Sequence, residues 1–596
     1  MAKPQSILIT DVGSTTTKAI LIEKTEGEYR LTGQANAPTT VEAPLEDVMI
    51  GLQEALGHLA RVTGRSFLED GQLIIPQQGT KGVDLYLSTS SAGGGLQMLV
   101  AGLMKVLTAE SAHRAALGAG AIVMDVLALD DGRLVVERIK RIRELRPDMI
   151  LLSGGTDDGN ISQVAGMAEY IAAAEPQPRL GEDFQVPLVY AGNVQARDYV
   201  EKVLSRQVSV HHSNNLRPTL EQEVLEPARR EIHRLYLEHV MSHAPGYRQL
   251  LEWTRGQIYP TPLAVGKVLQ TVARKRDLNL LAFDIGGATT DAFTVLDGIL
   301  HRTVSANLGM SYSLGNVLAE ARPENILRWL PFDLSERQLR NWNFNKMIRP
   351  TTLPETTEEL LLEQATAREA LRLSLQHHKS LAVTLRGVQQ SRSIAEVFKQ
   401  TPGGQTIVDL KKIQMVIGSG GVVSHAPRRS QAMLVLLDAV EPEGITSLYV
   451  DSAFLLPHLG ILSDHEPEIA LTVLEKDCLI PLGTVIAPAG IPRPGSPLAR
   501  VKIRFPDGGE GEEEVLSGRL KVVHLPAGQK ASVEIVPRRG FDVGAGPGVM
   551  IAAQVEGGQV GLVLDGRGRP LVLPTDPQHR QEILWSWFEA MQAFER

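Results

Sequence analysis

The stretch LLAFDIGGATTDAF, residues 280–293, carries the main evidence about the fold. It begins with apolar residues typical of a buried strand, reaches Asp284 and runs into a polar turn with two glycines. A similar phrase, ILITDVGSTTTKAI, occupies residues 7–20, so strand, aspartate, glycine and threonine recur in the same order. Residues 6–12 and 18–23 read as two strands joined by this first turn, which is the pattern of a β-hairpin.

Both turns have the composition of a metal–phosphate site. Glycine lets the backbone approach a ligand closely, and successive N–H groups can surround an anion. An aspartate repels phosphate, so Asp11 and Asp284 make sense if a divalent cation lies between, held through water because magnesium keeps much of its hydration shell. The alternative for each turn is a tight hairpin without a ligand. The repetition, together with a third glycine turn in IQMVIGSGGVVS (413–424), favours the site.

Three motifs carry a resemblance to a known superfamily. DVGSTTTK, DIGGATTDAF and VIGSGGVVS are similar, in that order, to the first phosphate, second phosphate and adenosine motifs of the actin, sugar kinase and heat-shock chaperone ATPases. The resemblance implies a two-lobed actin-like α/β fold in which duplicated ribonuclease H-like lobes each contribute a hairpin to one nucleotide. ATP and Mg²⁺ are the implied cofactors.

The resemblance also implies roles for individual residues. Asp11 and Asp284 would flank the magnesium and bind it through water, and Asp291 would lie near the metal or the attacking water; these three are the expected catalytic residues. Which of the three activates the water stays open. The residues expected to contact the nucleotide are Gly13, Ser14, Thr15, Thr16, Lys18, Gly286, Gly287, Thr289, Thr290, Gly418, Ser419, Gly420 and Gly421.

Over most of its length the chain resembles the glutamate mutase accessory family, also called glutamate mutase L or MutL type, which is unrelated to the DNA mismatch repair protein of similar name. The resemblance rests on the three motifs, on ILLSGGTDDGN (150–160) and on a length of 596 residues. It implies an ATP-dependent reactivating chaperone for an adenosylcobalamin-dependent mutase, in which a slow ATPase reaction drives lobe opening and cofactor exchange. Which mutase is served stays open.

Two other functions share these nucleotide motifs. Activators of 2-hydroxyacyl-CoA dehydratases have a similar first motif but bind an iron–sulfur cluster through cysteines, and this chain has only Cys478. The remaining alternative is a small-molecule kinase, or an ATP-dependent enzyme like hydantoinase or oxoprolinase. A kinase needs a base and a polar substrate pocket, and the sequence offers no clear candidate beyond the metal aspartates.

Four domains are expected along the chain. Residues 1–109 form the first ATPase lobe, and residues 110–275 an inserted doubly wound α/β domain with a helical linker, because strands and helices alternate there. Residues 276–465 form the second lobe. Residues 466–596, rich in glycine and proline, form a β-rich module that ends in a helix.

Further elements follow from local patterns. The apolar run LQMLVAGLMKVL (96–107) is interpreted as a helix, as are residues 218–243 and 248–274. The last helix is expected to begin after Asp576, an N-cap residue followed by proline. The glycine-rich end of the strand in residues 150–160 is a second candidate for a ligand or partner surface, because ligands bind at the carboxyl ends of strands in doubly wound sheets; the alternative is a simple turn.

Composition limits the partners. The formal net charge of -9 argues against non-specific affinity for nucleic acid or an anionic membrane surface. One cysteine excludes an internal disulfide, in keeping with a reducing compartment. The amino terminus lacks the pattern of a signal peptide, and no window has about 18 uncharged apolar residues. We therefore expect a cytoplasmic protein whose partner is the mutase; the sequence does not predict its oligomeric state.

Overall fold

The computed structural model describes residues 3–13, 16–41, 45–91, 96–159, 161–179, 184–240, 246–254, 258–384 and 405–595. These residues form a mixed α/β structure, as expected from the sequence. The chain divides into two compact units. The first comprises Met1–Thr271, Val383–Thr406 and Leu456–Asp477, and the second comprises Val272–Ala382, Ile407–Leu455 and Cys478–Arg596.

The first unit contains a five-stranded sheet in the order β12-β6-β1-β2-β3. Its strands are β1 (Ser6–Val12), β2 (Thr16–Thr25), β3 (Glu28–Pro38), β6 (Leu85–Ser90) and β12 (Ile258–Pro260). Strands β1, β2 and β3 are antiparallel neighbours, whereas β6 runs parallel to β1 and β12 parallel to β6. Helix α1 (Val48–Thr63) packs on β2 and β3, and the short strands β4 (Leu68–Glu69) and β5 (Gln72–Leu73) pair with each other. The hairpin expected at the amino terminus is therefore present.

A second, wholly parallel sheet in the first unit has the order β11-β10-β9-β7-β8. Its strands are β7 (Gln97–Ala101), β8 (Ile122–Leu127), β9 (Met149–Leu152), β10 (Val186–Tyr190) and β11 (Val208–His212). The inner strands β9 and β10 are buried at every residue, as expected for a parallel sheet covered on both faces.

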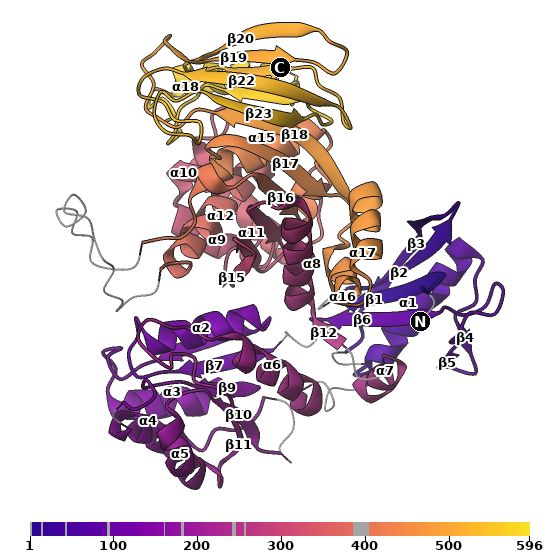
Figure 1. Ribbon diagram of the computed structural model, residues 1–596, viewed down its shortest axis with the longest axis vertical. Helices are drawn as coiled ribbons and strands as arrows, with labels where there is room; N and C mark the ends of the chain where they lie inside the picture. Colours follow the sequence, from indigo (N-terminus) through magenta and orange to yellow (C-terminus); the bar gives the residue numbers. More distant parts are fainter. Residues whose placement is uncertain are drawn as a thin grey trace. The chain divides into compact units, whose positions relative to one another are not determined.

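Helices cover both faces of this parallel sheet (Figure 1). One face bears α2 (Thr108–Gly118) and α6 (Glu226–Leu235), which continues as the π-helical turn Tyr236–Val240. The other face bears α3 (Val135–Leu145), α4 (Ser162–Ala174) and α5 (Arg197–Leu204). The doubly wound arrangement expected from the alternating pattern is thus observed.

The helix predicted over residues 96–107 is wrong. Its first half is β7, which lies between β8 and β9, and its second half is a connection that leads to α2. A short, wholly apolar run fits a buried strand and a buried helix equally well, so only the pairing with neighbouring strands decides between them. The parallel sheet therefore begins before residue 110.

The second unit is built on an eight-stranded sheet in the order β15-β14-β13-β16-β17-β18-β24-β21. Its strands are β13 (Leu280–Ile285), β14 (Thr290–Leu296), β15 (Ile299–Ser305), β16 (Met415–Ser419), β17 (Gly444–Asp451), β18 (Leu479–Ala487), β24 (Leu562–Asp565) and β21 (Leu520–Val523). The first five repeat the order and directions of the amino-terminal sheet, with an antiparallel trio followed by two parallel strands.

Helices cover the second sheet and form a large apolar core with it. The long helix α12 (Thr357–Leu381) packs on β14, β15 and α15 (Arg429–Val440). The other helices of this region are α9 (Leu314–Ala321), α10 (Pro323–Leu327), α11 (Glu336–Ile348) and the short α14 (Gly421–Ser424).

The carboxyl-terminal region is rich in strands, but it does not stand apart from the second sheet. Strands β18, β24 and β21 extend that sheet, while a separate four-stranded sheet has the order β20-β19-β22-β23. Its strands are β19 (Pro497–Arg504), β20 (Glu510–Leu516), β22 (Lys530–Pro537) and β23 (Ile551–Glu556). Strand β22 alternates exposed and buried residues along its length, so one face of this sheet packs and the other is exposed.

Several local predictions are confirmed and two need revision. Helix α18 (Pro577–Ala590) begins after Asp576, whose carboxylate accepts the His579 N–H at 2.8 Å. Residues 218–225 are not helical, and α6 starts with the Glu-Pro pair at 226. The stretch 248–274 is divided into α7 (Tyr247–Trp253), β12 and α8 (Thr261–Arg276). Helices α16 (Leu456–His465) and α17 (Pro467–Val473) precede β18, and the four-domain division stays a prediction.

Candidate functional site

The first glycine turn closes the β1–β2 hairpin. The Gly13 N–H donates to the Thr16 carbonyl at 3.1 Å, and Asp11 and Lys18 are register partners two rungs from the turn. A Cβ built on Gly13 would lie 2.7 Å from the Thr16 carbonyl oxygen, so the turn requires glycine. Ser14 and Thr15, both expected to contact phosphate, lie outside the described residues.

The carboxylate of Asp11 is buried and oriented by hydroxyl groups. Only 7% of the residue is exposed. Its Oδ1 accepts hydrogen bonds from the Thr89 hydroxyl at 2.7 Å and the Thr261 hydroxyl at 2.8 Å. Thr89 stands beside Asp11 on the parallel strand β6, and Thr261 is the first residue of α8. Two neutral donors on one oxygen fix the carboxylate without cancelling its charge.

A second threonine contact braces the same turn. The Thr39 hydroxyl donates to the Gly13 carbonyl at 2.8 Å and lies 2.9 Å from the Thr17 hydroxyl. Helix α16 also packs on β1 and carries His458, which is fully buried. Burial lowers the pKa of His458 to about 4, against the opposing influence of the Asp11 carboxylate, so this imidazole is neutral near pH 7.

The second glycine turn repeats the first. The Gly286 N–H donates to the Thr289 carbonyl at 2.8 Å, as Gly13 does to Thr16. The segment that follows β15 braces this turn: the Met310 N–H donates to the Gly286 carbonyl at 2.9 Å, and the Ser313 hydroxyl donates to the Ala288 carbonyl at 2.7 Å. The Thr290 hydroxyl donates to the Leu308 carbonyl. The turn is therefore preformed and held from one side.

The tip of the second turn presents backbone N–H groups. Gly287 and Ala288 are both exposed, and across the described residues no hydrogen bond engages either of their N–H groups. Successive amides of this kind can surround an anionic oxygen. The turn therefore has the donors that a phosphate group requires.

Two carboxylates lie on adjacent strands below this tip. Asp284 and Asp291 are register partners in the β13–β14 ladder, and both are half-buried. Arg302, from β15, donates its Nε to Asp291 Oδ1 at 2.8 Å and places its second nitrogen 2.7 Å from the same oxygen. The guanidinium is nearly buried and lies over the Phe293 ring. Asp291 is thus a fixed carboxylate with a cationic partner.

The third glycine turn lies next to the second in the same sheet. Ser419 is the register partner of Asp284 in the parallel pair β13–β16, so both stand at the carboxyl ends of their strands. Gly420 has φ 110°, and a Cβ there would lie 2.2 Å from the Ile285 carbonyl oxygen. A Cβ on Gly418 would meet Val423 and Leu436. Gly420 is therefore required by the close approach of the Ile285 backbone, Gly418 is closely packed by side chains, and Gly421 has open space around it.

The structure groups the predicted residues into two sets, one in each unit. The first set is Asp11, Gly13, Thr16 and Lys18; the second is Asp284, Gly286, Gly287, Thr289, Thr290, Asp291, Gly418, Ser419, Gly420 and Gly421. Each set combines glycine turns and hydroxyls with a carboxylate that is suited to a hydrated Mg²⁺, so the donor set fits a magnesium–nucleotide complex.

Sequence reasoning missed the residues that orient these carboxylates. Thr89 lies in the run DLYLSTSS (84–91), which contains β6, and the threonine and serines of that run were a signal for the partner of a buried aspartate. Arg302, Thr39 and Thr261 carry no recognisable pattern, because their contacts depend on strand pairing and helix placement.

The described residues lack both a cluster of direct metal ligands and a helix that could span a membrane. In the part of the chain that the structure describes, no group of three or more His, Cys, Asp or Glu side chains is arranged to hold a metal ion directly. Among the helices formed by the described residues, none has the length and apolar character needed to span a membrane.

Comparison with known proteins gives a family match. The family model described as "MutL protein" matches residues 7–478. The curated "Protein MutL" of Clostridium tetanomorphum is 29% identical over 504 residues, which cover 79% of this chain and 98% of that protein.

Solved structures give weaker likenesses. Nucleotide-free acetone carboxylase has a TM-score of 0.33 at 12% identity and covers 86% of this chain and 81% of its own. The ATP-dependent caprolactamase of Pseudomonas jessenii has a TM-score of 0.29 at 14% identity and covers 85% of this chain and 81% of its own. Likeness at this level does not establish a shared fold.

Proposed function

We propose, from the premise that this chain belongs to the MutL protein family, that it is an ATP-dependent accessory protein that reactivates an adenosylcobalamin-dependent mutase. The observation that supports ATP dependence is that the same glycine turn occurs in two sheets whose strands have the same order. Gly13 bonds to Thr16 as Gly286 bonds to Thr289, with Asp11 and Asp284 at the same rung of their ladders. Glutamate mutase, or a related enzyme, is the proposed partner.

The two turns have complementary parts in this proposal. Asp11, held by the Thr89 and Thr261 hydroxyls, is the proposed magnesium-binding carboxylate of the first turn, and Asp284 is that of the second; each would act through the water shell of the metal. The exposed backbone N–H groups at the tip of the second turn would bind phosphate oxygens. Lys18 would add a cation beside the first turn. ATP with magnesium supplies the phosphoanhydride bond whose hydrolysis drives the cycle.

Asp291 is the proposed partner of the attacking water. Its Oδ1 is held by Arg302, so the carboxylate cannot rotate freely, and it stays available as a hydrogen-bond acceptor on its other oxygen. Phosphoryl transfer to water needs placement and charge neutralisation more than covalent chemistry. A fixed acceptor beside Asp284 meets that need.

Hydrolysis does useful work only if the nucleotide states bind the mutase with different affinities. We therefore propose that one state binds the mutase tightly and promotes the release of damaged cobalamin, and that the other state dissociates. A small-molecule kinase on the same scaffold would behave differently, because its ATP consumption would depend on a small acceptor.

The test is a reactivation assay. Glutamate mutase inactivated with bound hydroxocobalamin is mixed with the protein, Mg–ATP and fresh adenosylcobalamin, and mutase activity is followed. Recovery that needs hydrolysable ATP is expected, with an ATPase rate that rises when mutase is added. No recovery with glutamate mutase or related mutases, together with ATP consumption that requires a small acceptor, would overturn the proposal.

A further inference from the structure

Five connections of the first unit meet at one edge of its parallel sheet. Each follows a strand and leads into the next helix, so all five lie at the carboxyl ends of β8, β7, β9, β10 and β11. We call this the carboxyl edge; its connections span residues 128–134, 102–107, 153–161, 191–196 and 213–225, of which residue 160 is not described.

Every one of these connections, or the first helical turn after it, exposes a large apolar side chain. Val136 is 75% exposed and Leu134 is 69% exposed, at the start of α3. The others are between 41% and 45% exposed: Met104, Val106, Ile161, Val194 and Leu220. Single exposed apolar residues are ordinary, but a set distributed over all five neighbouring connections is the composition of an interaction surface.

Hydrogen bonds tie the neighbouring connections together. The Lys105 N–H donates to Asp130 Oδ1 at 2.7 Å, and the Val194 N–H donates to Asp157 Oδ1 at 3.0 Å. The Asn215 side chain donates to the same Asp157 oxygen at 2.9 Å. A Cβ on Gly154 would lie 2.5 Å from Leu103, so Leu103 fills the space where the strand order reverses. The edge is therefore a preformed platform, which suits a macromolecule with an extended contact surface.

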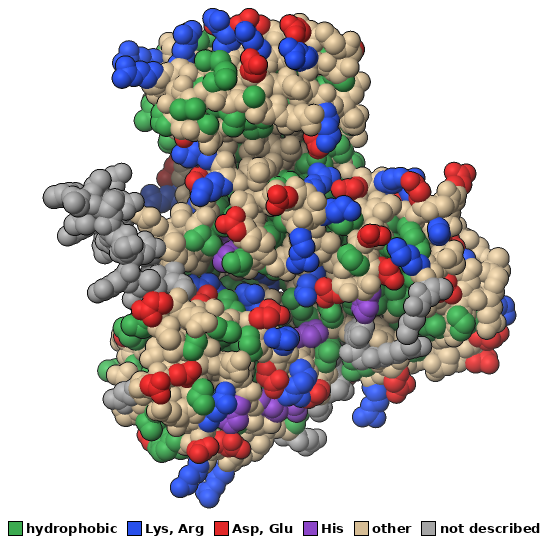
Figure 2. All heavy atoms as spheres, viewed as in Figure 1, with side chains coloured by type: hydrophobic (Ala, Val, Ile, Leu, Met, Phe, Trp, Pro, Cys, Tyr) green, Lys and Arg blue, Asp and Glu red, His purple; other side chains and the backbone are tan. Residues whose placement is uncertain are grey.

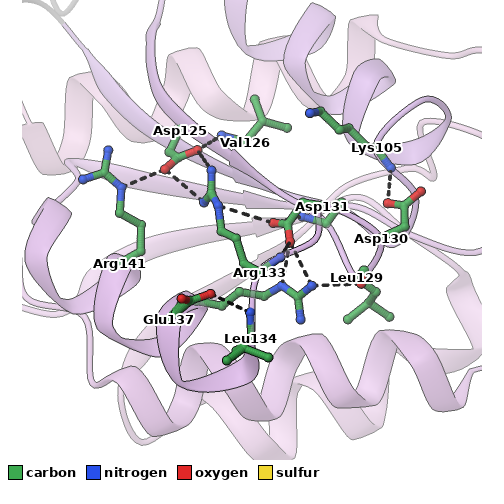
Figure 3. A network of polar contacts seen from close by, with 12 residues as sticks. Lys105, Asp125, Val126, Leu129, Asp130, Asp131, Arg133, Leu134, Glu137 and Arg141 are labelled. Atoms are coloured by element: carbon green, nitrogen blue, oxygen red, sulfur yellow. Dashed lines mark hydrogen bonds and ion pairs between the residues drawn. The ribbon is translucent and has the colours of Figure 1, made fainter.

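Charges at and next to the carboxyl edge are paired within the first unit (Figure 3). Arg133 lies between two carboxylates, 2.9 Å from Asp125 and 3.8 Å from Asp131. Arg141 pairs with Asp125 at 2.7 Å, and Arg138 pairs with Asp131 at 2.8 Å. The bonds from these arginines and from backbone N–H groups outweigh the effect of burial and lower the pKa of both aspartates, so the network is ionised and satisfied near neutral pH.

The exposed charges that remain around the apolar residues are mainly acidic. Asp130, Glu137, Asp158 and Glu221 are exposed on these connections or on the first turn of α3, whereas Lys105 is the exposed lysine among them. On the face of the molecule in Figure 2, acidic and basic side chains are interspersed. An apolar centre with an acidic border calls for a partner with an apolar patch bordered by lysine and arginine.

We infer that the carboxyl edge is the docking surface for a partner protein of that chemistry, and, resting on the function proposed above, that this partner is the mutase. Like charges oppose the two other occupants. A second copy would bring one acidic border against another, and an anionic bilayer would be repelled by the same carboxylates.

The test compares matched surface variants in a binding assay with glutamate mutase. L134S/V136S removes two exposed apolar side chains at the edge, and L353S/I491S removes two elsewhere that are 81% and 84% exposed. We expect the edge variant to raise the Kd for mutase about tenfold or more, because central apolar contacts dominate interface energy, and the control to leave it unchanged. Glu221→Lys, made as a separate variant, should weaken mutase binding at low salt and have no effect on it at high salt.

Two controls separate this inference from the proposed function. Circular dichroism and Mg–ATP binding report folding and the nucleotide turns, and both should match the wild type in all three variants. Wild-type Kd in L134S/V136S would overturn the docking surface and leave the reactivase proposal intact. Absence of wild-type binding to the mutase in every nucleotide state would overturn both. If the edge variant alone lost self-association, the surface would be assigned to a second copy of the chain. If it alone lost pelleting with phosphatidylserine vesicles, the surface would be assigned to a membrane. Either outcome would overturn the inference.

Discussion

Asp284 stands opposite Asp291 in the β13–β14 hairpin, at the rung where Asp11 stands opposite Lys18 in β1–β2. Like charges opposite each other destabilise a ladder, and here Arg302 lies against one of the two carboxylates. At this rung the first hairpin therefore has one carboxylate opposite one ammonium group, with no net charge, whereas the second has two carboxylates and one guanidinium. The net negative charge of the second hairpin suits a bound cation.

Asp284→Ala and Asp11→Ala should each abolish Mg²⁺-dependent ATP binding, because each removes a carboxylate proposed to hold the hydrated metal. Isothermal calorimetry with Mg–ATP measures the effect, and Asp297→Asn is the matched control, since Asp297 is exposed at the other end of β14. Each alanine variant should keep the wild-type circular dichroism spectrum. Full binding in both folded variants would remove the nucleotide assignment.

Arg302→Met should lower the ATPase rate more than it weakens ATP binding, because it frees Asp291 without touching the glycine turn. It should also lower the free energy of unfolding by about 3–5 kcal/mol, since it leaves a carboxylate that is 14% exposed without its cation. Urea unfolding measures this loss, and adding Asp291→Asn should recover part of it.

The exposed i,i+4 pair of Arg340 with Glu336 is the control for this prediction, because its side chains are 48% and 55% exposed. Arg340→Met should lower the free energy of unfolding by less than about 1 kcal/mol. Equal losses of unfolding free energy in Arg302→Met and Arg340→Met would mean that the buried pair stabilises the protein no more than an exposed pair does.

Gly420→Ala and Gly421→Ala should differ sharply although they are neighbours. Gly420 has φ 110° and no room for a Cβ beside the Ile285 carbonyl, whereas a Cβ on Gly421 has nothing within 4 Å. Strain of this kind costs on the order of 1–3 kcal/mol, and steric overlap with the backbone adds to it. Thermal unfolding should show a lower Tm only for Gly420→Ala. Similar Tm values in the two variants would contradict the tight approach of β16 to β13.

The stability of the second unit should fall as the pH drops below about 6.5. His378 is fully buried, with its ring nitrogens 3.0 Å and 2.8 Å from the hydroxyls of Thr294 and Thr303. Burial lowers its pKa to about 3, so between pH 6.5 and 3 the unfolded chain takes up a proton that the folded chain does not. This group therefore contributes a loss of up to about 1.4 kcal/mol for each pH unit across that window and none above it.

Thermal unfolding of wild type and His378→Gln at pH 7.5, 6 and 5 tests this prediction. The variant should be less stable at pH 7.5 but should lose less stability on acidification. His524→Gln, at an exposed site, should follow the wild type. Parallel pH profiles for all three proteins would show that His378 does not control the acid response.

Local sequence determined the elements whose geometry depends on a few adjacent residues. The two hairpins follow from apolar strands separated by a glycine turn. In the first turn glycine is required, since a Cβ on Gly13 would clash with the backbone three residues later. The start of α18 follows from the N-cap Asp576. These features are readable because their causes lie within one turn of chain.

Tertiary structure decided the elements that depend on pairing between distant parts of the chain. The run at 96–107 became strand β7 because β8 and β9 offer ladder partners on either side, and no local period distinguishes that outcome from a helix. Three carboxyl-terminal strands, β18, β24 and β21, joined the second sheet because β18 pairs with β17 on one side and with β24 on the other.

The same division holds for the site. Sequence predicted the aspartates and glycines of the candidate site. The partners of Asp11, by contrast, come from positions 78 and 250 residues away, and the partner of Asp291 comes from a neighbouring strand. The local sequence determines a side chain's residue type and its place in a turn. The groups that orient the side chain are brought to it by sheet register and helix packing, and both of these depend on burial of the whole core.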